Sequence, residues 1–419
     1  MAGVMKDSEV EWIGEIPEGW DISKVKYVGR YINGYAFKPD QWGQDGLPII
    51  RIQNLSGSSK SINYFDGKIS DDYLIDDGDI LISWSATLDA FIWNYGKGWL
   101  NQHIFKAIPN VQKIHKSYFF HLMKIAMLNM SSDKHGSAMQ HVTNQIFGNF
   151  QVPLPSLSEQ KLIADFLDEK CAEIDKLSED IQKQIDILND YKKSVITRAV
   201  TKGLDPNAEM KDSGIEYIGE VPTKWNIHPI YYYFDERRRK NSGNKEQNLL
   251  SLSYGHIIRK DINTNGGLLP ASFSTYNIVY KNDIIIRPTD LQNDKRSLRT
   301  GLVTERGIIT SAYIDLRPLD GVNSEYYHYL LHAYDIMKVF YNMGNGVRQG
   351  LNYSEFSKLL VLEPSSEEQR TIVSYLNDKC EQINSIIAAE LDRLNELQSY
   401  KKSIIYEYVT GKKRVKGEL

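Results

Sequence analysis

The chain of 419 residues contains only two cysteines, Cys171 and Cys380. So few cysteines exclude a disulfide framework and favour a reducing compartment. The sequence has no secretory leader pattern and no apolar run long enough to cross a bilayer, so we expect a soluble, cytoplasmic protein with no membrane contact. The net charge of −4 argues against a protein that binds nucleic acid through a nonspecific basic surface.

The sequence also lacks the motifs of the common catalytic sites. It contains no phosphate-binding P-loop, no GxGxxG, no HExxH, no CxxC pair and no Asn/Asp-Pro-Pro-Tyr/Phe tetrapeptide of amino-methyltransferases. Pro39-Asp40 with Asp66-Gly67-Lys68 fits the loose PD…(D/E)xK nuclease pattern only with a long spacing, and the second half of the chain has no copy of it. Five histidines between His103 and His141 lack metal-ligand spacing. We therefore predict a chain without catalytic residues, metal or bound cofactor.

What the sequence does contain is an internal repeat. The stretch that begins at Ser156 returns from Ser365 onwards, with each matched residue 209 positions later and no slip in register. Glu159-Gln160 matches Glu368-Gln369, and Lys170-Cys171 matches Lys379-Cys380. Equal segments of one chain should build equal structures.

Each copy has the pattern of one long helix. Apolar residues mostly recur every three or four positions, which places them along one stripe of a helix. In the first copy they are Ile163, Phe166, Ile174, Leu177, Ile181, Ile185, Leu188, Tyr191, Val195 and Ala199. In the second copy they are Ile372, Tyr375, Ile383, Ile386, Leu394, Leu397, Tyr400, Ile404 and Tyr408.

Both copies also carry start and stop signals. Ser156-x-x-Glu159 and Ser365-x-x-Glu368 fit the capping box, and Gly203 and Gly411 are suited to end the helices. A helix of about 45 residues is roughly 65 Å long and needs a partner for its stripe. We predict that the two copies pair as a two-helix coiled coil. The alternative is that each helix packs on its own globular domain.

The repeat extends to the segments before the helices. Met5-Lys6-Asp7-Ser8 through Trp20 returns as Met210-Lys211-Asp212-Ser213 through Trp225. Between these lead segments and the helices lie regions rich in short β-type runs, each followed by an aromatic helical stretch. The skeleton of the two regions repeats, whereas residues 57–101 and 260–310 share little. We predict two α+β domains of one fold with two different faces.

We therefore divide the chain into four parts. The predicted parts are a lead and first domain at 1–155, a long helix at 156–203, a second lead and domain at 204–364, and a second helix with a basic tail at 365–419. The second domain concentrates cations at Arg237–Lys240, at Arg259-Lys260 and around Arg299. An anionic partner should therefore meet the globular domains rather than the acidic helices, although Arg237–Lys240 also fits a solvated helix face.

The repeat resembles the specificity subunit of type I restriction-modification systems. The resemblance rests on "MKDSGIEYIGEVPTKW", on "PLPSLSEQKLIADFLDEK" with its copy "EPSSEEQRTIVSYLNDK", and on "KKSVITRAVTKGLDP". It covers essentially the whole chain. It implies two target-recognition domains that each bind one half of a split, asymmetric DNA sequence. It also implies that the two long helices form an antiparallel coiled coil that sets the spacer between the half-sites and docks two methylation subunits.

The resemblance implies that the catalytic sites lie on partner subunits. The methylation subunits of that family carry S-adenosylmethionine, and a separate restriction subunit uses ATP and Mg²⁺ to cut unmodified DNA. The function expected here is therefore non-catalytic DNA recognition. The alternatives are a coiled-coil scaffold with no DNA role and, with less support, a nuclease that uses Asp40, Asp66 and Lys68.

The resemblance does not supply the residues that read bases, so they are nominated from the sequence. We selected side chains that follow strand-like runs, on expected loops, and that can pair with base edges or phosphates. In the first domain they are Arg51, Gln53, Asn54, Trp84 and Ser85. In the second domain they are Tyr254, Arg287, Asp290, Gln292, Asn293, Lys295, Arg296 and Arg299. Gln140 and Gln349 lie at matched turns and are expected to bind phosphate or to have a structural role.

Overall fold

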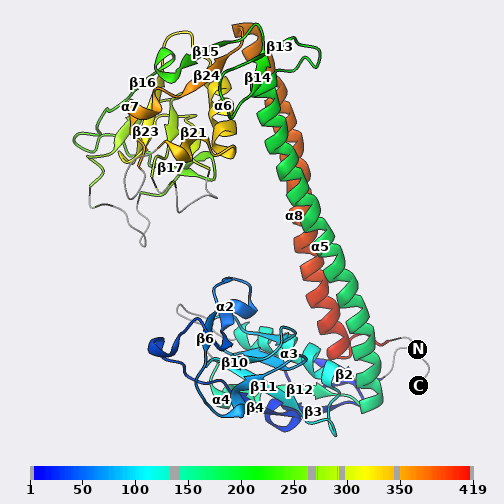
Figure 1. Cartoon of the computed structure of the whole chain (residues 1–419). Helices are drawn as coiled ribbons and strands as arrows, with labels where there is room; N and C mark the ends of the chain where they lie inside the picture. Colours follow the sequence, from blue (N-terminus) through cyan, green and yellow to red (C-terminus); the bar gives the residue numbers. More distant parts are fainter. Residues whose placement is uncertain are drawn as a thin grey trace. The chain divides into compact units, whose positions relative to one another are not determined.

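The computed structural model describes residues 4–132, 142–262, 270, 272–289, 291, 298–343 and 350–415. The chain divides into two units, which we describe separately. Unit 1 comprises residues 1–181 with 391–419, and unit 2 comprises residues 182–390. Each unit contains one globular domain together with part of each long helix (Figure 1).

The strands of unit 1 form two four-stranded sheets and two two-stranded sheets. One large sheet has the order β4-β11-β8-β9 and the other β6-β5-β10-β7, while β1 pairs with β2 and β3 with β12. The strands are β1 (Met5–Asp7), β2 (Glu15–Pro17), β3 (Asp21–Lys24), β4 (Gly29–Asn33), β5 (Leu47–Ile50), β6 (Asn63–Phe65), β7 (Leu74–Ile75), β8 (Ile80–Ser83), β9 (Asp89–Ile92), β10 (Gly98–Leu100), β11 (Ile104–Pro109) and β12 (Gln151–Leu154). The helices are α1 (Val25–Val28), η1 (Pro39–Gln41), α2 (Ile52–Leu55), η2 (Asp71–Tyr73), α3 (Lys116–Ser132) and α4 (Asn144–Asn149).

The elements of unit 2 repeat the frame of unit 1 with a different second layer. A four-stranded sheet has the order β16-β23-β20-β21, and the remaining strands pair as β13-β14, β15-β24, β17-β18 and β19-β22. The strands are β13 (Met210–Asp212), β14 (Glu220–Pro222), β15 (Asn226–Pro229), β16 (Phe234–Glu236), β17 (Leu250–Ser253), β18 (His256–Arg259), β19 (Asn277–Val279), β20 (Ile284–Ile286), β21 (Thr300–Leu302), β22 (Gly307–Ile309), β23 (Ile314–Pro318) and β24 (Leu360–Glu363). The helices are η3 (Ile230–Tyr232), α6 (Ser324–Ile336), η4 (Val339–Asn342) and α7 (Tyr353–Phe356).

The main sheets of the two units match in register. In unit 1 Leu81 of β8 lies opposite Lys106 of β11, and in unit 2 Ile285 of β20 lies opposite Asp315 of β23. The lead hairpins and the pairs β3-β12 and β15-β24 also match. The prediction of two similar α+β domains is therefore confirmed. The sheet that carries β5, β6, β7 and β10 has no four-stranded counterpart among the described residues of unit 2, which agrees with the unequal sequences there.

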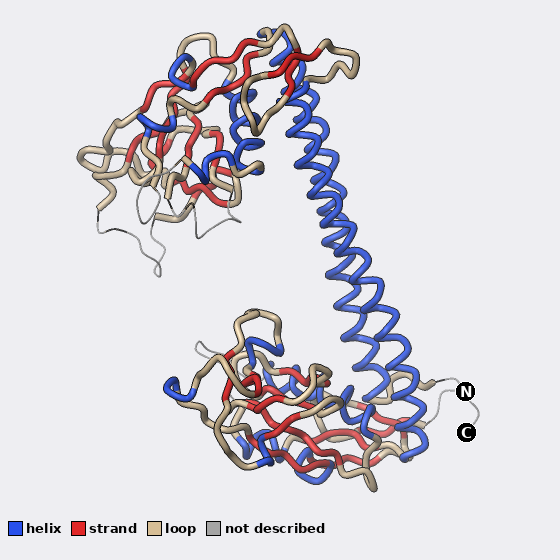
Figure 2. Tube along the Cα trace, in the orientation of Figure 1, coloured by secondary structure: helices blue, strands red, loops and turns tan. Residues whose placement is uncertain are grey.

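The two repeated segments form long helices, as predicted. Helix α5 runs from Leu157 to Lys202 and helix α8 from Ser366 to Val409 (Figures 1 and 2). The hydroxyls of Ser156 and Ser365 accept the backbone N–H groups of Glu159 and Glu368, at 3.3 and 3.2 Å. These bonds satisfy one orphan donor at each helix start. At the first helix the second half of the capping box is replaced, because the Glu159 carboxylate accepts the indole N–H of Trp20 at 2.8 Å.

Both helices end at the predicted glycines. Gly203 and Gly411 have φ values of 74° and 72°, in the left-handed region that ends helices. A lead segment packs against each of these ends. A Cβ at Gly411 would meet Pro17 and Trp20, and one at Gly203 would meet Pro222 and Trp225. The Gly-Glu-Ile/Val-Pro…Trp lead is thus a cap for the C-terminal end of a long helix in both units.

Within each unit the two long helices pack against each other. In unit 1 the Lys401 ammonium lies 2.5 Å from the Asp175 carboxylate, and in unit 2 the Lys192 ammonium donates to the Asn384 amide oxygen at 2.8 Å. The predicted pairing as an antiparallel coiled coil is confirmed. Part of the predicted stripe is nevertheless exposed to solvent: Leu177 at 49%, Tyr191 at 53%, Ile386 at 48% and Tyr400 at 55%.

The two cysteines are buried in the cores of different units. Cys171 belongs to the core of unit 1 and Cys380 to that of unit 2, and both are free thiols. Burial raises the pKa of each thiol above its ordinary value. They are small core residues, as predicted. Among the helices that the structure describes, none is long and apolar enough to span a membrane.

Candidate nucleic-acid interface

The nominated residues at the ends of β8 and β20 lie at the same end of the matched strand in the two domains. Trp84 and Ser85 follow β8 in unit 1, and Arg287 follows β20 in unit 2. Strand β8 pairs with β11 as β20 pairs with β23, so the loops after β8 and β20 leave corresponding ends of the two sheets. A repeated frame thus presents different side chains at an equivalent point.

Arg51 begins the short helix α2 directly after β5. Its guanidinium lies over the Trp42 ring, 5.1 Å from the ring centroid, and donates to the Asn63 amide oxygen at 2.7 Å. The Trp42 side chain is 40% exposed, and Arg51 is half-buried. Stacking on an aromatic face holds an arginine in one direction without removing its charge. Arg51 is therefore a preorganised cation at the surface of domain 1, and Trp42 is a residue that the sequence analysis missed.

Asn54 holds the loop around Arg51 in shape. Its amide oxygen accepts the backbone N–H of Arg51 at 3.1 Å, and its amide nitrogen donates to the carbonyl of Ser61 at 2.9 Å. These bonds occupy the groups that would read a base. The side chain of Gln53 is half-buried on the same helix. Asn54 therefore has a structural role in this structure, whereas Gln53 stays a prediction.

Trp84 and Ser85 lie deeper than expected. The Trp84 ring stacks on Phe105, with ring centroids 5.7 Å apart, and its indole N–H donates to Asn33 at 3.1 Å. Ser85 is 7% exposed. Their nomination as base contacts is not supported by these positions, because both side chains pack against the domain.

Tyr254 occupies the tip of the β17-β18 hairpin in domain 2. Tyr254 and Gly255 have φ values of 46° and 81°, the positive values that a two-residue type I′ turn requires. The Tyr254 side chain is 82% exposed. A large aromatic residue this exposed at a hairpin tip is suited to contact a partner, so its nomination stays a prediction.

Arg299 was nominated as a DNA contact, and the structure places it in the interior. The side chain is fully buried, its guanidinium donates to the carbonyl of Thr289 and to the hydroxyl of Tyr341, and its backbone N–H donates to Asp335. Burial raises the pKa of Asp335 to about 6. The nomination is therefore wrong for this structure. Arg299 ties the segment after β20 to the rest of the domain.

Arg287 is half-buried directly after β20, where its backbone pairs with that of Arg299. It stays a candidate for a base or phosphate contact. The other nominated residues of domain 2 lie outside the described residues: Asp290, Gln292, Asn293, Lys295 and Arg296. Gln140 and Gln349 also lie outside them.

A cluster of arginines around Tyr280 was not found from the sequence. The guanidinium groups of Arg237, Arg239 and Arg306 lie 4.6, 5.8 and 5.5 Å from the Tyr280 ring centroid. Arg239 also donates to the Tyr280 hydroxyl at 2.6 Å. The first two come from the run Arg237–Lys240, which begins directly after β16 and is not a helix face. The sequence signal was this basic run, and only the fold brings Tyr280 and Arg306 to it.

Two buried carboxyl groups lie beneath this cluster. Asp283 and Asp315 are each 1% exposed, and Arg237 pairs with Asp283 at 3.0 Å and lies 3.9 Å from Asp315. Burial and the neighbouring Asp283 raise the pKa of Asp315 to about 8. In unit 1 the same sheet position holds Lys106, which pairs with Asp79 at 2.8 Å. The cation that pairs with Asp79 thus lies on β11, whereas the cation that pairs with Asp283 directly follows β16.

The nuclease hypothesis required Asp40, Asp66 and Lys68 to act together around a metal. Asp40 lies in η1, and Asp66 follows β6. In the part of the chain that the structure describes, no three His, Cys, Asp or Glu side chains are grouped to hold a metal ion. The arrangement of polar, aromatic and cationic residues on both domains is suited to binding.

Comparisons with known proteins agree with this arrangement. A family described as "Type I restriction modification DNA specificity domain" matches residues 17–187. The MjaVIII specificity subunit of Methanocaldococcus jannaschii is 24% identical over 423 residues, which cover 96% of this chain and 95% of the relative. The MjaX subunit of the same organism, described as putative, is 27% identical over 96% of both chains. Residues 17–187 thus match a type I DNA specificity domain, and nearly the whole chain is similar to specificity subunits of type I restriction-modification systems.

Other matches cover part or all of the specificity subunit. The EcoBI specificity subunit of Escherichia coli is 26% identical over 197 residues, which cover 46% of this chain and 41% of that protein. A solved chain from a study of complex assembly and conformational transition in a type I R-M system has a TM-score of 0.64 at 14% identity, over 94% of this chain and 98% of that one. At this identity the likeness shows the fold alone. The named relatives are specificity subunits, so these similarities favour DNA recognition over nuclease activity.

Proposed function

We propose that this chain is the DNA sequence-recognition subunit of a type I restriction-modification complex. Each globular domain binds one half of a bipartite, asymmetric site on double-stranded DNA through major-groove and phosphate contacts. The coiled coil sets the spacer and docks two methylation subunits, and restriction subunits join the full complex. The methylation subunits bind S-adenosylmethionine, and the restriction subunits bind ATP and Mg²⁺.

One observation carries the proposal above the others. The same sheet, with the same register, recurs in both units, whereas the sheet β6-β5-β10-β7 of unit 1 has no four-stranded counterpart among the described residues of unit 2. A repeated frame lets both domains approach the duplex in the same way, and different loops on that frame let them recognise two different DNA sequences. In domain 2 the arginines around Tyr280 and the exposed Tyr254 supply phosphate and base-stacking chemistry.

The exposed apolar residues of the long helices support the docking of two identical partners. Leu177 and Tyr400 are half-exposed in unit 1, and Ile386 and Tyr191 are half-exposed in unit 2. Leu177 matches Ile386 in the repeat, and Tyr191 matches Tyr400. Each unit therefore offers the same kind of apolar pair close to its Lys–Asp or Lys–Asn contact. Equivalent exposed patches suit two copies of one partner.

Mapping of adenine methylation tests the proposal. The chain would be expressed with its neighbouring methylation subunits in a host without other adenine methylation, and the genome would be sequenced for modified adenine. We expect one new motif with two different halves separated by a fixed nonspecific spacer. Replacing residues 226–363 by the matching domain of another specificity subunit should change one half only. Absence of new methylation with all subunits assembled would contradict the proposal and favour a scaffold.

A further inference from the structure

The two units share a hydrogen bond between the globular domain and a long helix. In unit 1 the Nε2 of His121, on α3, lies 2.7 Å from the carboxylate of Asp168, on α5. In unit 2 the hydroxyl of Tyr329, on α6, donates to the amide oxygen of Asn377, on α8, also at 2.7 Å. Asp168 and Asn377 are matched residues of the repeat, 209 positions apart.

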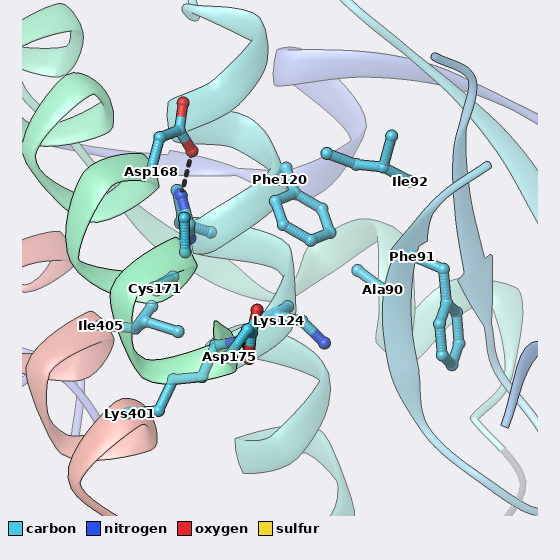
Figure 3. Close-up of a pocket in the computed structure, with 12 residues that line it drawn as sticks. Ala90, Phe91, Ile92, Phe120, Lys124, Asp168, Cys171, Asp175, Lys401 and Ile405 are labelled. Atoms are coloured by element: carbon cyan, nitrogen blue, oxygen red, sulfur yellow. Dashed lines mark hydrogen bonds and ion pairs between the residues drawn. The ribbon is translucent and has the colours of Figure 1, made fainter. Parts of the chain in front are cut away.

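A second matched contact lies about two helical turns farther along. Asp175 of α5 pairs with Lys401 of α8 in unit 1, and Asn384 of α8 pairs with Lys192 of α5 in unit 2. Figure 3 shows Asp168, Cys171 and Asp175 on one long helix, with Lys401 and Ile405 on the other. These contacts line a cavity of about 380 Å³ in unit 1 and one of about 550 Å³ in unit 2.

The matched contacts use different chemistry. Unit 1 uses a histidine with an aspartate, and unit 2 uses a tyrosine with an asparagine. Both aspartates of unit 1, Asp168 and Asp175, are amides in unit 2. What the two units have in common is thus the position of the bond and its length. This indicates a geometric role, in which the bond fixes the angle at which a domain sits on its own part of the coiled coil.

The rest of this joint is bonded more completely in unit 1. The Trp20 indole donates to Glu159 at 2.8 Å, the Tyr118 hydroxyl donates to the Val409 carbonyl at 3.1 Å, and the Gln160 amide oxygen accepts the His115 backbone N–H at 2.7 Å. These bonds join the lead, the domain and both helices. Several bonds therefore fix the angle between domain 1 and the long helices, so that the loss of one leaves the others in place.

In unit 2 the matched groups make fewer bonds. The indole N–H of Trp225 and the hydroxyl of Tyr326 are buried without a hydrogen-bond partner among the residues that the structure describes. Gln369 donates to the Pro364 carbonyl at 3.0 Å, within its own helix start. The Tyr329–Asn377 bond therefore carries a larger share of the orientation of domain 2 than its counterpart carries in unit 1.

We propose that Tyr329 and Asn377 are positioning residues that fix the tilt of domain 2 on the coiled coil and so restrict the spacer that the complex accepts. His121 and Asp168 do the same for domain 1, with support from their neighbours. The inference rests on the proposed function. A domain of this size is roughly 30 Å across. A tilt of about 6° moves its far side by about 3 Å, close to the rise of about 3.4 Å per base pair.

The test uses the assembled complex with the methylation subunits and duplexes that carry the mapped half-sites. The spacer is native, or longer or shorter by one base pair, and the ratio of affinities measures spacer discrimination. Asn377→Leu and Tyr329→Phe each remove the bond. Asn377→Asp keeps an acceptor and copies the residue of unit 1. Tyr232→Phe is a matched control, because its side chain is 56% exposed at the surface of the same unit.

We expect Asn377→Leu and Tyr329→Phe to reduce spacer discrimination about fivefold, the equilibrium equivalent of one hydrogen bond. Asn377→Asp and Tyr232→Phe should leave it unchanged, and all four variants should keep the sequence of both half-sites. Asn377 is exposed on its helix, so its replacement leaves the core intact. A purely structural role would lower thermal stability and affinity for all spacers alike, without a change in their ratio.

Two results would overturn the inference and leave the proposed function in place. One is unchanged spacer discrimination in Asn377→Leu, and the other is equal loss of discrimination in Tyr232→Phe. Amide hydrogen exchange of the DNA-free chain gives an independent readout, since loss of the bond should speed exchange in α6. Failure of the proposed function looks different: the wild-type complex would then methylate no split motif.

Discussion

At the scale of single residues, the domains differ in how they neutralise the aspartate that directly precedes the strand β8 or β20. Unit 1 places Lys106 opposite β8, so that one cation balances Asp79. Unit 2 places Asp315 at the matched position and brings in Arg237 from the adjacent strand, so one arginine faces two carboxyl groups. One arginine cannot neutralise two buried carboxylates, so burial favours the protonated form of Asp315.

Because unit 2 buries one carboxyl group more than its arginine can neutralise, we predict that Asp315→Asn stabilises unit 2. The pKa of Asp315 is raised to about 8, above its ordinary value of 3.8. Its contribution to stability is therefore complete below about pH 4 and is lost as the pH rises through 8. An amide cannot titrate, so the variant should gain about 4 kcal/mol in free energy of unfolding at pH 7 and little at pH 4. Urea unfolding at both pH values measures this.

The control for that experiment is Asp320→Asn. Asp320 is exposed in the loop before α6, so its replacement should change the stability little at either pH. If Asp315→Asn destabilised the protein equally at pH 4 and pH 7, the carboxyl group would be a required partner rather than a buried excess.

Arg299 gives a prediction that separates folding from DNA contact. Arg299→Met removes the donors to Thr289 and Tyr341 and leaves buried oxygens unpaired. We expect a loss of about 2–4 kcal/mol in the free energy of unfolding. Thermal unfolding of the DNA-free chain measures the loss. Weaker DNA binding with unchanged stability would contradict the structural role and restore Arg299 as a contact.

At the scale of elements, the ends of the long helices give the sharpest test. Gly203 and Gly411 have the same positive φ, but a Cβ would lie 2.4 Å from Pro17 at Gly411 and 3.2 Å from Glu368 at Gly203. Gly411→Ala should therefore cost more than Gly203→Ala, by about 1–3 kcal/mol. Gly57→Ala is the matched control, because Gly57 has a φ of 72° and no atom within 4 Å. Denaturant unfolding of the three variants ranks these costs.

Equal losses in the three variants would show that the backbone conformation alone sets the cost. A larger loss at Gly411 would show that the lead segment seats tightly on the end of α8. The second outcome follows from the contacts of Pro17 and Trp20 with this glycine.

The long helices were predictable because their signals are local. Period, cap and stop residues lie within each segment, and all of them act within a few residues of each other. The exposure of Leu177 and Tyr400 was not predictable, because periodicity finds an apolar face without showing what covers it. The burial of Arg299 was missed for a similar reason: its partners, Thr289, Asp335 and Tyr341, come together only in the fold.

At the scale of the whole molecule, the contacts of the coiled coil define its register. The Asp175–Lys401 and Asn384–Lys192 contacts are separated by 17 residues on each helix, so the intervening segments are equal in length. Equal segments allow matched deletions that keep both contacts and both joints with the globular domains. The coil can thus be shortened without altering either recognition surface.

The length of the coiled coil is expected to set the length of the DNA spacer. Deleting residues 178–184 from α5 together with residues 387–393 from α8 removes seven residues from each helix, or about 10 Å. We expect the methylated motif to keep both halves and to lose about three base pairs of spacer, at about 3.4 Å per base pair. Deleting only one of the two segments breaks the register and should abolish methylation. An unchanged spacer in the double deletion, with the complex assembled, would show that the coiled coil does not measure the distance, and that the partner subunits or the DNA set it instead.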